Sequence, residues 1–300
     1  MFNLKQNVDA GSPKPVNLEA GRRAFLRSAG LMAAGAATLG LAGMPENAQA
    51  QELDDATILN FALNLEYLEA EFYLIAAFGR RLIDADTDGS GRLGGVIGGR
   101  AVDFKTSLIK AYAAEIARDE QAHVRFLRKA LGSAKVARPG INLKSSFTAA
   151  ARAAGLVDSK TEFDAFANED NFLLAAFIFE DVGVTAYKGA ARFISNKDYL
   201  EAAAGLLAVE AYHAGEIRSL LASRGLFDQA NAISDARDSL DGESDLDQGI
   251  RMDKSVNIVP TDSNGLAFSR SPQQVLNIVY LGDSASAASF FPRKLNGGIA

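Results

Sequence analysis

The two histidines are the most constraining feature of this chain, because each follows a glutamate by three residues within an apolar helical pattern. Glu120 precedes His123, and Glu210 precedes His213. Residues three apart on a helix leave the same face, about one turn from each other. The apolar residues on these two faces are Ile109, Tyr112, Ala113, Ile116, Val124, Leu127 and Leu131, and Ala203, Leu206, Leu207, Ala214, Ile217, Leu220 and Leu221. One such histidine would be read as an ordinary core or surface residue, but two in matched contexts indicate a shared function.

The spacing of apolar residues predicts four long helices. Their expected spans are about 54–79, 99–131, 168–194 and 197–224. Asp54 is a suitable N-cap for the first helix and Gly79 a suitable end, and Asn196 and Gly225 bound the fourth in the same way. The connection 133–169, with a short helix near 146–154, is long enough to cross from one end of a bundle to the other. We therefore expect an all-α four-helix bundle with a long crossover between its second and third helices.

The first and third helices each place one glutamate in the apolar stripe, followed by a tyrosine seven residues later. The pairs are Glu66 with Tyr73, and Glu180 with Tyr187. The first two helices and the last two therefore look like two copies of one helical hairpin. Glu69 also has apolar neighbours, but its counterpart in the second copy is Gly183, so the repeat favours Glu66 as the inward carboxylate.

The six inward polar side chains are Glu66, Glu120, His123, Glu180, Glu210 and His213. A carboxylate left unpaired in a core costs several kcal/mol, and these faces offer no Lys or Arg to pair with it. Two divalent cations would nearly cancel the four negative charges, with Glu120 and Glu210 bridging the ions and Glu66 and Glu180 each closing one. The alternative is a metal-free bundle in which the glutamates pair with Arg or Lys.

The identity of the metals is restricted by the ligand types. The chain has no cysteine, which excludes thiolate zinc sites, Fe–S clusters and disulfides. Mixed oxygen and nitrogen ligands with room for water or dioxygen suit two Fe or Mn ions better than closed tetrahedral zinc. Tyr73 and Tyr187 could hydrogen-bond to a ligand carboxylate, or they could be ordinary core tyrosines.

The first fifty residues resemble a twin-arginine export signal. Arg22 and Arg23 precede an Ala/Gly/Leu-rich run from 28 to 44, and Ala48-Gln49-Ala50 resembles a cleavage site. The expectation is cleavage after Ala50 and a periplasmic or otherwise exported protein; an N-terminal membrane anchor is the alternative. The twin-arginine export machinery carries folded proteins, often with a cofactor already bound, so this resemblance agrees with a metal site.

The charge and hydropathy of the remaining chain exclude other classes of partner. The whole chain carries −6, and removal of residues 1–50, with a net charge of +2, leaves −8. No basic stripe indicates binding to nucleic acid or anionic lipid. No apolar run after residue 50 reaches the ~20 residues that span a membrane.

The loop at 84–95 begins with the Asp-x-Asp-x-Asp-Gly spacing of a calcium-binding loop. The twelfth position is Gly95, where such loops supply a bidentate glutamate, so a solvated turn is the favoured interpretation over a calcium ion.

The last part of the chain differs in composition from the predicted bundle. Residues 228–268 are rich in Asp, Ser, Gly and Asn and indicate a mostly irregular extension, although 228–240 could form a short helix. Ser271-Pro272-Gln273-Gln274 is typical of a helix start, and the short helix after it is expected to dock on the bundle. We therefore divide the chain into a signal at 1–50, a bundle at 51–226 and an extension at 227–300.

The helix pattern and its candidate ligands resemble the ferritin-like superfamily, and more closely the ferritin-like domain of desiccation-related proteins. The resemblance covers about residues 52–226, and segments 275–280 and 290–297 are also similar to that group. It implies a ferritin-like bundle with a dinuclear Fe or Mn carboxylate site of the kind that Glu66, Glu180 and the two Glu-x-x-His pairs would form.

Two classes of function follow from this resemblance. The first is redox chemistry with dioxygen or peroxide, in which a manganese pair favours peroxide disproportionation and an iron pair favours Fe(II) oxidation or oxygen activation. The second is a non-catalytic desiccation or stress protein in which the metals hold the bundle together. Storage within a ferritin cage fits less well, because the shell would have to accommodate the extension 227–300.

Overall fold

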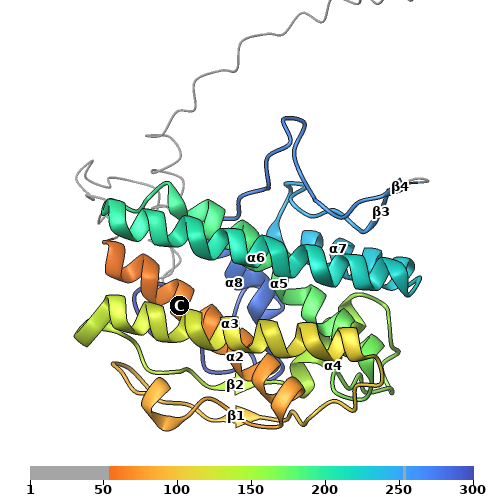
Figure 1. The fold of residues 1–300 in the computed structure, drawn as a ribbon, viewed down its shortest axis with the longest axis horizontal. Helices are drawn as coiled ribbons and strands as arrows, with labels where there is room; N and C mark the ends of the chain where they lie inside the picture. Colours follow the sequence, from red (N-terminus) through yellow and green to blue (C-terminus); the bar gives the residue numbers. More distant parts are fainter. Residues whose placement is uncertain (1–53, 253–254) are drawn as a thin grey trace, which may run out of the picture.

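The computed structural model describes residues 54–252 and 255–300 and contains the four long helices as a bundle (Figure 1). The helices are α2 (Asp55–Phe78), α3 (Ser107–Leu131), α5 (Glu169–Ala191) and α6 (Lys197–Ser223). α2 packs along α3 and α5 along α6, so the bundle consists of two hairpins. The expectation of an all-α fold is confirmed. The signal residues Arg22, Arg23 and Ala50 lie outside the described residues.

Local capping residues set most of the helix ends. The Asp54 side chain accepts a hydrogen bond from the Thr57 amide at 2.7 Å, and Gly79 ends α2 with φ of 65°. The Asn196 side chain likewise accepts from the amides of Asp198 and Tyr199 at the start of α6. None of the described helices has the length and hydropathy needed to cross a membrane.

The start of α3 was predicted wrongly. The helix begins at Ser107 instead of residue 99, because Gly98 and Gly99 have φ of 83° and 84° and the chain then runs beside α2. The backbone amides of residues 105 and 106 donate to the carboxylate of Glu169, at the start of α5. The first turn of α3 thus finds its acceptor on another helix rather than on a local cap.

Two long connections cover one side of the bundle. The first contains η2 (Asp84–Asp86) and β1 (Val96–Ile97), and the second contains η3 (Gly132–Ala134), β2 (Ile141–Asn142) and α4 (Ser145–Ala153). β1 and β2 pair in parallel, with Val96 opposite Ile141, and α4 confirms the short helix expected near 146–154.

The aspartates of the 84–95 loop neutralise arginines of α3. The Asp86 carboxylate lies 2.8 Å from Arg125, and Asp88 forms an ion pair with Arg128. These contacts use the charges that a calcium ion would need, so they give the calcium interpretation no support.

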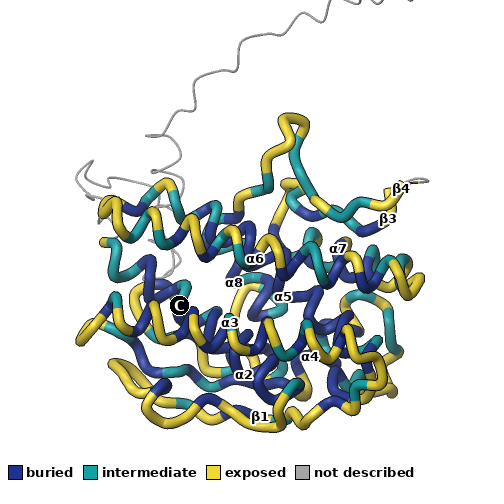
Figure 2. The backbone as a smooth tube through the Cα atoms, in the orientation of Figure 1, coloured by how far each residue is buried: buried dark blue, intermediate teal, exposed yellow. Residues whose placement is uncertain are grey.

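The extension is more regular than expected. It contains α7 (Phe227–Asp241), an antiparallel pair β3 (Arg251–Met252) and β4 (Ser255–Val256), and α8 (Pro272–Tyr280). α8 begins with the predicted capping box between Ser271 and Gln274, and it contacts α5 and α7. Buried residues follow α8 and the facing sides of the four long helices (Figure 2). The extension therefore shares the core of the bundle.

A buried network of arginines and aspartates connects the extension to α5 and α6. Its members are Arg218, Arg237, Arg270, Asp181, Asp241 and Asp247. Arg218 forms a double hydrogen bond with Asp181 at 2.9 Å, and Arg270 lies 2.7 Å from both Asp241 and Asp247. Charged groups are tolerated in a core when they are paired in this way.

Candidate metal centre

The six polar side chains selected from the sequence converge in the middle of the bundle, from four different helices. Their exposed fractions are Glu66 1%, Glu120 0%, His123 7%, Glu180 1%, Glu210 0% and His213 3%. In the described part of the chain, the four glutamates have no Arg or Lys as an ion-pair partner; their charged neighbours are the two histidines. The pairing with Arg or Lys that the metal-free alternative required is therefore not found among the described residues.

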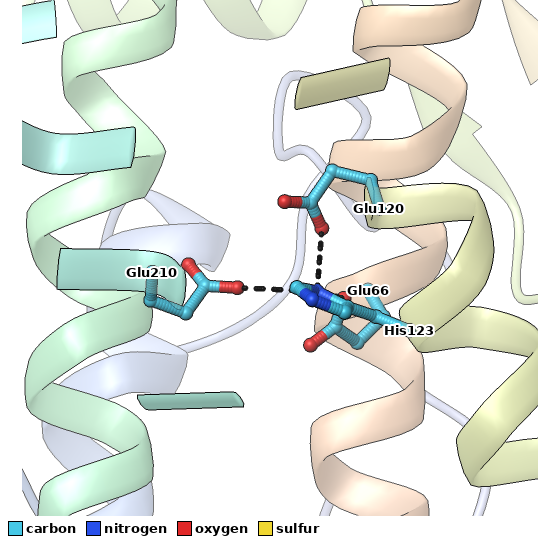
Figure 3. A group of neighbouring side chains, drawn as sticks. All are labelled: Glu66, Glu120, His123 and Glu210. Atoms are coloured by element: carbon cyan, nitrogen blue, oxygen red, sulfur yellow. Dashed lines mark ion pairs between the residues drawn. The ribbon is translucent and has the colours of Figure 1, made fainter. Parts of the chain in front are cut away.

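His123 is the centre of one half of the cluster. Its Nδ1 atom lies 3.3 Å from Glu66 Oε2, 3.5 Å from Glu120 Oε2 and 3.7 Å from Glu210 Oε1. Figure 3 shows Glu210 reaching from α6 toward the imidazole of α3. These four residues offer ligand atoms that all lie within 4.8 Å of one another, so they could hold one metal ion.

His213 is the centre of the other half. Its Nδ1 atom lies 3.0 Å from Glu120 Oε1 and 3.8 Å from Glu180 Oε2. The rings of His123 and His213 are separated by 6.3 Å between centroids. Glu120 directs one oxygen to each imidazole, which is the position that a carboxylate bridging two ions would take.

The atoms that face this cluster lack hydrogen-bond partners. They are Glu66 Oε2, both carboxylate oxygens of Glu120 and of Glu210, Glu180 Oε2, and Nδ1 of His123 and His213. Buried polar atoms are rarely left without partners in proteins, and the cost of each is about 1–3 kcal/mol. Carboxylate oxygens and imidazole nitrogens are ligands for Fe and Mn, so this donor set fits two such ions.

In the absence of metal ions, burial and mutual contact shift the pKa values of the carboxylates and imidazoles in the cluster. Burial raises the pKa of Glu66 to about 7 and that of Glu180 to about 8. Burial acts to lower the pKa of His123, but the negative charge of Glu66 and the nearby carboxylate of Glu120 raise it to about 11. Burial acts to raise the pKa of Glu120, but the two imidazoles hold it below its usual range. Without metal ions, protons retained on the glutamates and the imidazoles therefore offset the buried negative charge.

The two tyrosines connect the hairpins crosswise. The Tyr73 hydroxyl of α2 donates to Glu180 Oε1 of α5, and the Tyr187 hydroxyl of α5 donates to Glu66 Oε1 of α2. Each bond satisfies the carboxylate oxygen that does not face a histidine. The tyrosines thus fix the orientation of both glutamates.

Two further carboxylates lie near the cluster: Asp119, which sequence reasoning missed, and Glu69, which it considered and set aside in favour of Glu66. Asp119 Oδ2 lies 3.3 Å from His213 Nε2, so it fixes the ring orientation that turns Nδ1 toward the centre. Its position directly before Glu120 is the only sequence signal for this role. Glu69, one turn after Glu66, is 6% exposed, and its pKa is raised well above the usual range by burial and by the charges of Glu120 and Glu180.

A four-helix bundle with a buried cluster of glutamates and histidines defines a protein of the ferritin-like type. The chain belongs to the ferritin-like domain family, whose model matches residues 54–223. It is 30% identical over 263 residues to the desiccation-related protein PCC13-62 of Craterostigma plantagineum, covering 81% of this chain and 83% of the relative. It is 26% identical over 266 residues to the ferritin-like catalase Nec2 of Nesocodon mauritianus, covering 82% and 85%. No solved structure matches the chain.

Proposed function

We propose that the chain binds two Fe or Mn ions between the six converging side chains and uses them to remove peroxide in protection against stress. The observation that carries the proposal is the set of buried oxygen and nitrogen atoms without partners, all directed to one place. Two divalent cations balance the charge of Glu66, Glu120, Glu180 and Glu210 with His123 and His213 neutral.

The protein side chains position the ions and limit access to them. Glu66 and His123 would hold one ion, Glu180 and His213 the other, and Glu120 would bridge them. The fourth carboxylate belongs to Glu210, whose Oε1 lies 3.7 Å from His123 Nδ1. It would add a ligand to the ion held by Glu66 and His123. When bound, the metal pair supplies the electrons exchanged with peroxide. The complete burial of the glutamates keeps bulk water and larger reductants away from it.

Peroxide disproportionation is the reaction best supported among those open to such a pair. One relative carries the name ferritin-like catalase, and the buried site of this chain admits only a small reactant. Oxidation of Fe(II) by dioxygen is a second reaction that the same ligands allow, and an iron pair would favour it.

A non-catalytic role is the competing proposal, favoured by the similarity to a desiccation-related protein. In that role the metals would hold the bundle together during drying. Elemental analysis of purified protein tests the shared part of both proposals, with about two Fe or Mn ions per chain expected. Metal-free protein of full stability would contradict both.

Turnover separates the two roles. Metal-free protein is loaded with Mn or Fe, and oxygen released from hydrogen peroxide is recorded with an oxygen electrode; Fe(II) oxidation is followed by absorbance. Oxygen release with two ions bound supports peroxide removal. A large metal-dependent rise in melting temperature without turnover of either reactant supports the structural role.

The pKa values predict how metal binding changes stability with pH. The pKa of Glu66 rises from 4.5 to about 7 and that of Glu180 to about 8, so their stabilising protonation is complete below pH 4.5 and is lost as pH approaches 8. The metal-free protein should therefore lose stability over this range, whereas bound cations replace the protons. The rise in melting temperature on metal loading should be larger at about pH 8 than at about pH 5.5, by at least about 5 °C.

Differential scanning calorimetry of loaded and chelator-treated protein at both pH values measures this difference. Glu120 acts in the opposite direction, because its lowered pKa contributes stability above pH 4.5 that is lost in more acidic solution. Its effect lies below the range compared. An equal rise at the two pH values would contradict metal binding at these carboxylates.

We also propose that the protein is exported through the twin-arginine pathway with residues 1–50 removed. Mass spectrometry of the protein from the periplasm of an expressing bacterium should give a chain that starts at Gln51. Replacing Arg22 and Arg23 with lysine should retain the full-length chain inside the cell. Equal export of this variant and the unchanged chain would contradict the proposal.

A further inference from the structure

A small apolar cavity lies against the metal centre on the side covered by the extension. Glu69 of α2 and Gly183 of α5 form its polar end. The rest of its wall consists of Leu65, Leu68, Ile178, Phe179 and Val182 of the bundle and Ile278, Val279 and Phe290 of the extension. Its volume is about 20 Å³, enough for one molecule of the size of water or dioxygen.

Glu69 has no role within the packing of the bundle. The described residues offer its carboxylate no hydrogen bond and no ion pair, although the residue is 6% exposed. The Glu69 carboxylate lines the cavity, so a small molecule that enters the cavity can form a hydrogen bond with it. Glu69 lies about one turn after Glu66 on α2, which places it beside the cluster.

Gly183 makes room for the carboxylate of Glu210 at the end of the cavity nearest the cluster. A Cβ atom at residue 183 would lie 2.3 Å from Glu210 Oε2, so no larger residue fits without moving that ligand. In the internal repeat, residue 183 corresponds to Glu69. The two halves of the centre are therefore unequal, with a carboxylate at Glu69 and a glycine at the equivalent position 183.

The extension forms the outer wall of the cavity. Ile278 is 2% exposed, Val279 4% and Phe290 0%. The Phe290 amide donates to the carbonyl of Val279 at 3.1 Å, and the Phe290 carbonyl accepts from Asn142 at 2.9 Å. These bonds hold Phe290 to α8 on one side and to β2 on the other. The cavity is therefore a feature of the whole fold, and a four-helix bundle without the extension would lack it.

We propose that this cavity is the binding site for the small uncharged reactant of the metal centre, hydrogen peroxide or dioxygen, and that Glu69 is the polar group that contacts it. An apolar wall favours a neutral molecule over a hydrated ion or a charged oxygen species. The inference rests on the proposed redox function for its reactant, whereas the presence of a site for a small neutral molecule can be measured without turnover.

The first test uses xenon as a neutral probe of comparable size. Crystals of the full chain pressurised with xenon should show one xenon atom between Glu69, Val182 and Val279. The cavity assignment is overturned if xenon is absent there. A chain that binds xenon at this place but turns over no peroxide with either metal refutes the proposed function and leaves the cavity assignment intact.

The second test fills the cavity. Val279→Leu adds one methylene to its wall, and Val275→Leu makes the same change one turn earlier on α8, where the side chain lies beside Ile58 and Phe61 instead. With two ions bound in both variants, kcat/KM for peroxide should fall about tenfold in Val279→Leu and stay unchanged in Val275→Leu. Equal values in the two variants would overturn the proposal.

The third test concerns Glu69 itself. Glu69→Gln keeps the shape of the side chain and should retain two metal ions by elemental analysis, while kcat/KM for peroxide falls and xenon still occupies the cavity. Loss of an ion in this variant would make Glu69 a metal ligand and overturn its assigned contact with the reactant.

Discussion

Glu120→Ala is expected to abolish binding of the metal pair and with it all turnover. Glu120 directs one oxygen to each imidazole, at 3.5 Å from His123 and 3.0 Å from His213, so its loss affects both ions at once. Changing a group that merely orients a ligand costs about 10–100-fold in affinity, and removal of a bridging ligand should cost more. Elemental analysis and oxygen release from peroxide measure the two effects.

The fold should survive this change, because it removes one of several crowded carboxylates. Circular dichroism of the variant is therefore expected to match that of the unchanged protein. Glu115→Ala is the matched control, since Glu115 lies on the same helix and is exposed. Retention of two ions in Glu120→Ala would show that the metals bind elsewhere. Equal losses of metal in the two variants would show that the loss does not depend on the position of Glu120 between the imidazoles.

Arg270→Ala is expected to produce the largest loss of stability. The Arg270 guanidinium donates to Asp241 and Asp247 at 2.7 Å and to the Thr185 hydroxyl at 2.9 Å, and its side chain is buried. Removing one partner of a buried ion pair leaves uncompensated charge and costs about 3–5 kcal/mol. The melting temperature should fall by about 10 °C.

Thermal denaturation of the two forms of the chain, both loaded with metal, provides the measurement. Arg293→Ala is a suitable control, because Arg293 is exposed and belongs to the same extension. A change in melting temperature of similar size in both variants would contradict a specific role for the buried network. The extension should also become more susceptible to proteolysis in Arg270→Ala, because this residue connects it to α5.

Elements whose ends depend on nearby residues could be predicted from the sequence. Asp54, Asn196 and Ser271 each cap a helix through an amide two or three residues away, so a local pattern was sufficient. The start of α3 could not be found in this way, because its first amides donate to Glu169, more than sixty residues along the chain. The three buried arginines and their aspartates likewise share no spacing that would indicate their contacts.

The candidate site was accessible to sequence reasoning for a physical reason. A carboxylate or imidazole in an apolar helical stripe has to find a partner in the core, and the internal repeat showed which residues correspond. The same repeat favoured Glu66 over Glu69 as the inward carboxylate, because the counterpart of Glu69 is a glycine. The structure places both residues at one cavity, so the departure from symmetry is itself a feature of the site.

The crosswise tyrosines have a consequence for the origin of this architecture. Tyr73 donates a hydrogen bond to a glutamate of the second hairpin, and Tyr187 donates one to a glutamate of the first. Neither hairpin therefore contains a complete half of the centre. An ancestral gene encoding a single hairpin could have formed such a centre only as two identical chains related by a twofold axis. Duplication and fusion of that gene would have allowed the two halves to change independently. Two identical chains could not have had Glu69 in one half and Gly183 at the equivalent position of the other.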